Sequence, residues 1–124
     1  MEEMDRMLKK IEAIIVRDPT YKFEAYTFVM AGLHYTVSKL TKARHVTGQE
    51  LCQGLRDYAL EQFGPFARTV LDYWGIHQTG DFGKVVFHLI EAELFKKTEE
   101  DSLRDFENLY DFGQAFQYEI KEEG

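Results

Sequence analysis

The sequence contains little cysteine and little proline, and it has no long apolar run. Its single cysteine, Cys52, excludes an internal disulfide and is typical of a protein kept in a reducing compartment. No stretch approaches the roughly 20 apolar residues that a membrane-spanning helix needs. Charged residues interrupt residues 1–10, which favours an amphipathic helix over a signal peptide. These absences predict a cytoplasmic protein that does not enter a membrane.

The chain does have enough apolar and aromatic residues for a core. With 124 residues, of which 44% are apolar and 15% aromatic, the sequence predicts a single domain over residues 1–124. The net charge of −7 is concentrated at one end, because residues 99–124 carry nine acidic and two basic side chains. We expect this acidic C-terminal end to favour solubility. The alternative is that it repels nucleic acid or contacts a basic partner.

The first 45 residues have the apolar spacing of two helices. Pro19 separates them, because proline disfavours the α conformation of the residue before it. Residues 1–45 are therefore predicted to form a helical hairpin. The apolar positions are Met4, Met7, Leu8, Ile11, Ile14 and Ile15 in the first helix, and Phe23, Tyr26, Val29, Met30, Leu33, Val37 and Leu40 in the second.

A third helix, over residues 48–63, has the clearest boundaries. Thr47 and Glu50 have the spacing of a capping box at its start. Gly64 is a typical residue at a helix end, and Pro65 is typical of a helix start. A short fourth helix follows, and the side chains expected to face inward from it are Phe66, Ala67, Val70, Leu71 and Trp74.

A fifth helix is predicted over residues 79–94, with Thr79 as its N-cap. Its apolar face consists of Phe82, Val85, Val86, Leu89 and Ile90, and its polar face of Asp81, Lys84, His88 and Glu91. We expect the polar face to be solvated, with charge pairs three and four residues apart. Phe87 lies about 100° from the centre of the apolar face, so it must cover the hairpin predicted after this helix or remain exposed.

After residue 94 the pattern changes to alternation. Residues 95–98 and 106–112 are predicted to be two strands of a hairpin, joined by the charged segment 99–105. Residues 114–120 fit either a strand or a short helix. The predicted fold is therefore mainly α with a small β-hairpin. The helical hairpin packs on a winged-helix-like C-terminal half, residues 46–124, which ends in the acidic segment.

Five segments of the chain form a recognisable set. They are His45–Leu51, Phe63–Ala67, Tyr73–Ile76, Thr79–Gly83 and Leu109–Phe112. This set resembles the signature of a small uncharacterised bacterial family of planctomycete and verrucomicrobial type, and the resemblance covers nearly the whole chain. It implies a stand-alone bacterial protein of this length, and it implies no activity, ligand or catalytic residue.

No combination of residues predicts catalysis, a cofactor or a metal site. The glycines do not form a nucleotide-binding pattern. Among possible metal ligands only His77 and Asp81 have a spacing of four residues, and the expected helix start between them breaks that geometry. The helix dipole could activate Cys52, but its position beside Leu51 favours a buried, unreactive thiol.

One basic patch and one exposed helix face are candidates for binding. The patch comprises Lys39, Lys42, Arg44 and His45, which could hold the phosphate backbone of RNA or could simply complement a helix dipole. Sequence-specific DNA binding is not expected, because Lys84 is the only cation on the polar face of the fifth helix. His88 lies on that same face.

The apolar stripe of Met4, Met7, Leu8 and Ile11 is a candidate for protein contact. Methionine is common at adaptable binding surfaces, so the stripe could form a homodimer interface or could pack inside the monomer. The leading prediction is a non-enzymatic interaction module, in which a winged-helix-like scaffold with candidate contacts at the stripe and at Phe87 binds a protein. The alternative is a nucleic-acid-associated protein that binds backbone phosphate through residues 39–45.

Overall fold

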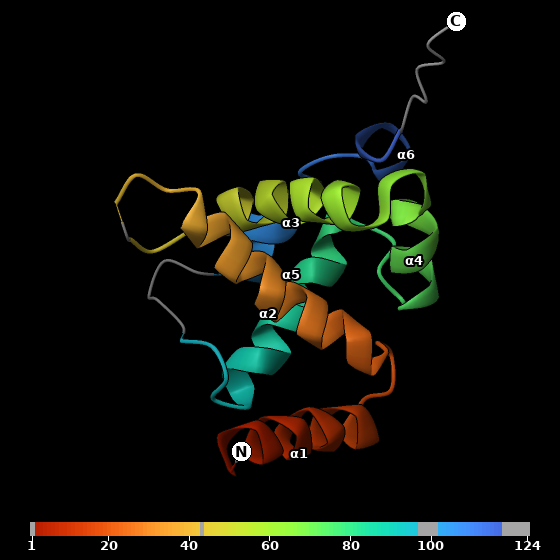
Figure 1. Cartoon of the computed structure of the whole chain (residues 1–124). Helices are drawn as coiled ribbons and strands as arrows, with labels where there is room; N and C mark the ends of the chain where they lie inside the picture. Colours follow the sequence, from red (N-terminus) through yellow and green to blue (C-terminus); the bar gives the residue numbers. More distant parts are fainter. Residues whose placement is uncertain (1, 43, 97–101, 118–124) are drawn as a thin grey trace, which may run out of the picture.

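A computed structural model describes residues 2–42, 44–96 and 102–117, and these residues are helical or irregular. The elements are α1 (Glu2–Arg17), α2 (Phe23–Ser38), α3 (Gly48–Phe63), the 3-10 helix η1 (Gly64–Phe66), α4 (Ala67–Tyr73), α5 (Thr79–Glu91), the 3-10 helix η2 (Leu103–Phe106) and α6 (Phe112–Ala115). In Figure 1, α2 crosses in front of α5, α3 lies across one end of both, and α1 lies at the other end.

The core lies where α2, α3 and α5 meet. Side chains that are completely buried come from each of them, including Val29 of α2, Leu55 of α3 and Val85 of α5. Helix α1 contributes Ile11 and Ile14, and the C-terminal segment contributes Phe106 and Phe112. The predicted apolar positions Ile11, Val29, Leu55 and Val85 are therefore buried as the helical spacing indicated, and differences in α1, the α4 segment and α5 are described below.

Two glycines allow α2 and α3 to approach closely. A Cβ atom at Gly54 of α3 would overlap the side chain of Thr36 on α2, and one at Gly32 of α2 would overlap Leu55. The Thr36 hydroxyl donates a hydrogen bond to the Gly32 carbonyl at 2.7 Å, so this polar side chain is satisfied within its own helix. The crossing depends on residues that lack a side chain.

The predicted boundaries of α3 are confirmed. The backbone N–H of Glu50 donates to Thr47 Oγ1 at 3.1 Å, and the Thr47 N–H donates to Glu50 Oε1 at 3.1 Å. Gly64 follows the helix with a φ of 51°, a conformation that glycine adopts at little cost. Pro65 lies in η1, a single 3-10 turn before α4.

The predicted β-hairpin and winged-helix-like half are wrong: residues 2–42, 44–96 and 102–117 contain no strand. Helix α5 ends at Glu91, and Glu93 just after it is in the left-handed region, at a φ of 61°. The Leu94 N–H donates to the Leu89 carbonyl at 2.8 Å. This bond is typical of a Schellman helix end. The loss of helical spacing at residue 95 therefore marks the end of a helix. Residues 97–101, which include half of the expected first strand, lie outside the described residues.

The alternating aromatics of residues 106–112 are buried without forming a strand. Phe106 ends η2 and Phe112 begins α6, and both side chains are buried. Between these two helices the Leu109 N–H donates to Thr79 Oγ1 at 3.2 Å, so a side chain takes the place of a strand partner at this residue. The question of residues 114–120 is answered as far as residue 117: α6 ends at Ala115, and residues 118–120 lie outside the described residues.

Helix α4 differs from its predicted packing. Phe66, expected to face inward, is 67% exposed, and Tyr73 is 72% exposed. Trp74, expected between the fourth and fifth helices, contacts Phe28 of α2 and Phe63 of α3, with ring centroids 5.5 and 5.6 Å apart. The start of this segment is a 3-10 turn, which rotates Phe66 away from the face that a continuous α-helix would bury.

Candidate functional site

An apolar pocket lies between α2, the start of α3 and the end of α5. Its cavity volume is about 400 Å³, which is within the roughly 300–1,000 Å³ typical of small-molecule sites. The described residues that line it are Leu33, Val37, Arg44, His45, Val46, Gly48, Leu51, Val86, Ile90, Leu94, Phe95, Lys96 and Phe106.

Two helix ends shape this pocket. At one side the chain reverses after α5 through Glu93, which places Leu94 and Phe95 beside the last turn of the helix. At the other side Gly48 opens α3 next to Phe106, whose ring would lie 3.1 Å from a Cβ atom at position 48. The pocket is therefore bounded by segments that are far apart in the sequence, so apolar spacing alone does not reveal it.

The formally charged side chains among the described lining residues, Arg44 and Lys96, are both basic. His45 also lines the pocket, and no described lining residue is acidic, although the whole chain has a net charge of −7. Among the described residues, no carboxylate forms an ion pair with Lys96, whose side chain is exposed. A pocket with apolar walls and basic residues suits an apolar molecule that carries a negative charge.

Arg44 is already bound to a carboxylate outside the pocket lining. Its two terminal nitrogens lie 2.9 and 2.6 Å from the two carboxylate oxygens of Glu50. The guanidinium and the Thr47 backbone N–H together lower the pKa of Glu50 to about 2. Glu50 thus both caps α3 and holds the head of Arg44.

The four residues of the predicted basic patch are not all brought together. Arg44 and His45 line the apolar pocket. Lys39 lies over the ring of Tyr35, with its ammonium 5.0 Å from the centroid, and lines a separate groove that also contains Glu50 and Asp57. Lys42 is exposed. The expectation that this patch binds a phosphate backbone is untested and stays a prediction.

The face of α5 expected to be solvated is partly buried, so that expectation is wrong for two residues. Asp81 is only 7% exposed and accepts three hydrogen bonds. Its donors are the Tyr21 hydroxyl at 2.6 Å and the backbone N–H groups of His77 and Gln78 at 2.9 and 3.2 Å. Gln78 therefore takes the N-cap position predicted for Thr79, because Asp81 reaches back to that residue.

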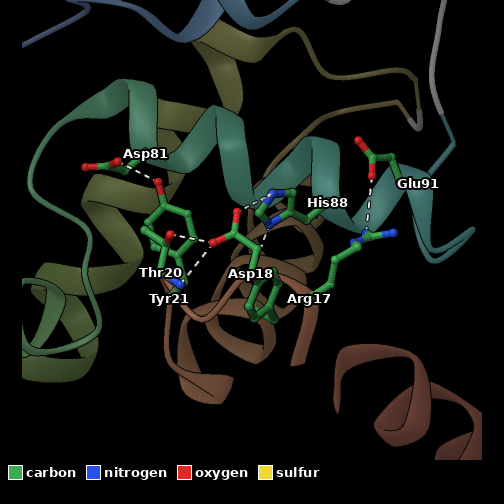
Figure 2. Close-up of polar contacts among 8 residues, drawn as sticks. Arg17, Asp18, Thr20, Tyr21, Asp81, His88 and Glu91 are labelled. Atoms are coloured by element: carbon green, nitrogen blue, oxygen red, sulfur yellow. Dashed lines mark hydrogen bonds and ion pairs between the residues drawn. The ribbon is translucent and has the colours of Figure 1, made fainter. Parts of the chain in front are cut away.

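His88, on the same helix, joins α5 to the N-terminal helices (Figure 2). Its Nδ1 lies 2.8 Å from the Tyr26 hydroxyl, and its Nε2 lies 3.6 Å from the carboxylate of Asp18. Asp18 also accepts hydrogen bonds from the backbone and the hydroxyl of Thr20, which lower its pKa. Asp18, Tyr21, Tyr26, Asp81 and His88 are called the loop–α5 cluster below.

The loop–α5 cluster contains residue types that are common in catalytic sites, but here they bond to one another and link α5 to the N-terminal helices. Burial raises the pKa of Tyr26 to about 12, and burial together with the Asp81 hydrogen bond raises the pKa of Tyr21. Both phenols are therefore neutral and almost completely buried. None of the five residues lines the apolar pocket. The cluster fastens the loop between α1 and α2 to α5.

The remaining candidate residues on α5 lie apart from the pocket. Phe87, expected to cover the β-hairpin or to remain exposed, packs edge-on against Phe106 of η2, with ring centroids 6.4 Å apart, and the described residues form no hairpin there. Lys84 is exposed and borders a small polar hollow with Glu107 and Asn108. Arg17 of α1 reaches Glu91 at 3.3 Å, so the last polar residue of α5 also contacts the N-terminal helix (Figure 2).

The apolar stripe of α1 is divided between core and surface. Ile11 is completely buried, Met7 and Leu8 are half-buried, and Met4 is 63% exposed. The C-terminal part of the stripe thus packs inside the monomer. The homodimer interface expected at Met4, Met7 and Leu8 remains a prediction for the N-terminal end of the helix.

Cys52 is a buried thiol, as its position beside Leu51 indicated. Burial raises its pKa to about 12. Its carbonyl accepts a hydrogen bond from the Tyr110 hydroxyl at 2.6 Å. A thiol that is both inaccessible and protonated is a poor nucleophile.

Sequence reasoning missed Lys96 and the apolar residues that surround it. Leu33, Val37 and Ile90 were recognised as core positions, but their helical spacing gives no sign that a cavity separates them. Lys96 was assigned to a strand. The sequence gives no sign of the turn at Glu93, because the chain reverses there without the glycine or asparagine that usually marks such a helix end.

No helix among the described residues combines the length and the apolar character that crossing a bilayer requires. Comparison of the chain with models of known protein families, with curated proteins and with solved structures finds no match.

Proposed function

We propose that this protein is a non-enzymatic binding module whose apolar pocket takes a small amphipathic carboxylate. The observation that carries the proposal is the combination of a cavity of about 400 Å³ with basic residues, and no acidic one, among its described lining. The ligand is expected to have an unbranched or aromatic apolar body and one anionic group.

The apolar walls supply the affinity for the body of the ligand. Side chains from α2 and α5 face each other across the cavity, and burying apolar ligand surface there gives about 25 cal/mol per Å². The cationic edge supplies the selectivity for the head group. Lys96 is an exposed residue, so a carboxylate can pair with it without first displacing an ion-pair partner among the described residues.

Calorimetric titration with three ligands of equal length tests the proposal. Octanoate should bind with a dissociation constant between about 10 µM and 1 mM, as expected for a ligand of this size. Octylamine should bind at least tenfold more weakly, and 1-octanol should fall between them. Equal affinity for all three, or no binding of octanoate, would contradict the proposal.

A charge reversal locates the binding site. Lys96→Glu should weaken octanoate binding severalfold and leave 1-octanol binding unchanged. Lys84→Glu is the matched control, since it makes the same change of charge at an exposed lysine outside the pocket lining. An equal loss in both variants would indicate a general effect of net charge and would remove Lys96 from the site.

Protein contact is a second candidate, and two exposed aromatic side chains of η1 and α4 favour it. Phe66, at the end of η1, is 67% exposed, and Tyr73, at the end of α4, is 72% exposed. Large aromatic side chains are typical anchors of protein interfaces. Self-association through these side chains would appear as a concentration-dependent mass in sedimentation velocity that Phe66→Ser with Tyr73→Ser abolishes.

A further inference from the structure

We infer that Arg44 is a second anion-binding residue of the pocket, and that a bound carboxylate takes its guanidinium from Glu50. The inference rests on the proposed function, because it concerns the same cavity. It adds a specific residue and an exchange of partners: Glu50 competes with the ligand for Arg44 and thereby sets the affinity of the site.

Arg44 is placed to serve either partner. Its side chain contributes to the pocket lining, while its two terminal nitrogens bind Glu50, which is not a lining residue of that cavity. The side chain of Arg44 is 52% exposed and that of Glu50 is 36% exposed. Solvent can therefore replace either partner, so the pair exchanges more readily than a buried one.

Glu50 is the member of the pair that stays in place. It belongs to the capping box, where its Oε1 accepts the Thr47 N–H and its own N–H donates to Thr47 Oγ1. Arg44 precedes α3 in an irregular segment, and its long side chain has many rotamers. When a ligand arrives, rotation of Arg44 leaves the capping box of α3 intact, whereas displacement of Glu50 breaks it.

The geometry of the present pair indicates the head group of the ligand. Arg44 binds both oxygens of one carboxylate, and a planar guanidinium matches a carboxylate through two parallel hydrogen bonds. A ligand carboxylate can reproduce that arrangement, whereas a hydroxyl or an amine cannot. Arg44 and Lys96 both line the cavity, so both would pair with the same head group.

Glu50→Gln tests the exchange. Glutamine at this position preserves a capping box, so the variant should fold, but it no longer holds a guanidinium by charge. Octanoate affinity should rise about twofold to fivefold, the range that an exposed ion pair represents, and 1-octanol affinity should not change. Glu91→Gln is the matched control, because it removes the same charge from a glutamate that binds Arg17.

A double-mutant cycle separates exchange from a general effect of charge. Arg44→Gln should weaken octanoate binding, and Glu50→Gln should have no further effect in the Arg44→Gln background. Additive effects would overturn the inference. Octanoate binding by the wild type with no gain in Glu50→Gln would also overturn it and would leave the proposed function intact. Absence of octanoate binding in both proteins would overturn both.

Discussion

The two sides of α5 differ in the kind of contact that they make: one side forms buried hydrogen bonds, and the other lines an apolar cavity. Toward the loop between α1 and α2, polar groups are buried and each has a partner, as Tyr21 with Asp81 and Tyr26 with His88 show. Toward the end of α2, the same helix presents Val86 and Ile90 to an apolar cavity. The first side fixes the position of the helix, and the second is the side at which we propose that a ligand binds.

This contrast shows that the loop–α5 cluster, unlike the pocket, requires a hydrogen-bond partner for each polar side chain. No buried side-chain polar atom of the described residues lacks a hydrogen-bond partner, so changes to the loop–α5 cluster leave a donor or acceptor unpaired. The pocket has open space instead of partners. We therefore expect substitutions in the cluster to reduce stability and substitutions in the pocket to alter binding.

The largest effect is expected at Asp81. Asp81→Ala removes the acceptor of three hydrogen bonds, including that of the buried Tyr21 hydroxyl, and should lower the free energy of unfolding by about 2–4 kcal/mol. Urea denaturation followed by circular dichroism measures this change. Lys84→Ala, at an exposed position of the same helix, should change it by less than about 0.5 kcal/mol. Similar values for both variants would remove the distinction between the cluster and the surface.

A smaller loss is expected at Tyr26. Tyr26→Phe keeps the buried ring and removes only the hydroxyl that meets His88, so the free energy of unfolding should fall by about 0.5–1.5 kcal/mol. Tyr73→Phe is the control, because the Tyr73 side chain is 72% exposed. If the control lost as much stability, the contact with His88 would not be the cause.

A substitution in the pocket should alter ligand binding more than stability. Val37→Phe adds a ring to a half-buried lining residue, and the open cavity should accommodate it with a stability change within about 1 kcal/mol. Octanoate binding should fall more than tenfold, because the added ring occupies the cavity. Val16→Phe, at a position 85% exposed on α1, should leave binding unchanged. A strongly destabilised Val37→Phe would show that the space is not available to a ligand.

The smallest effect concerns pH. Arg44 and the Thr47 N–H lower the pKa of Glu50 from its usual 4.5 to about 2. A depressed pKa contributes stability that is complete above pH 4.5 and is lost as the pH falls toward 2. The melting temperature of the wild type should therefore fall more steeply over this window than that of Glu50→Gln. Parallel curves would show that the ion pair is too exposed to contribute.

Local signals predicted the helices well. The capping box of Thr47 and Glu50 and the stop at Gly64 depend on residues within one turn of each other, so they could be identified in the sequence and are confirmed. The face that buries Ile11 and Ile14 follows from helical spacing for the same reason. Such features need no information about distant parts of the chain.

Features that depend on distant residues were missed. The alternation of Phe106, Tyr110 and Phe112 resembles a strand, yet these side chains pack on α3 and α5 from two short helices and an irregular segment. Asp81 was assigned to solvent because its partner Tyr21 lies 60 residues earlier. The pocket arises from a helix end at Glu93, a conformation that glycine or asparagine usually signals.

The single thiol can be used to measure how often the protein opens locally. Cys52 is completely buried in α3, next to the pocket-lining Leu51, and the chain has no other cysteine. A thiol reagent can therefore react only when this region opens, and the rate of labelling follows the population of the open form. A ligand that binds the closed protein lowers this population in proportion to its saturation. Labelling kinetics would thus report occupancy of the site without any added probe, even for a ligand whose binding releases no heat.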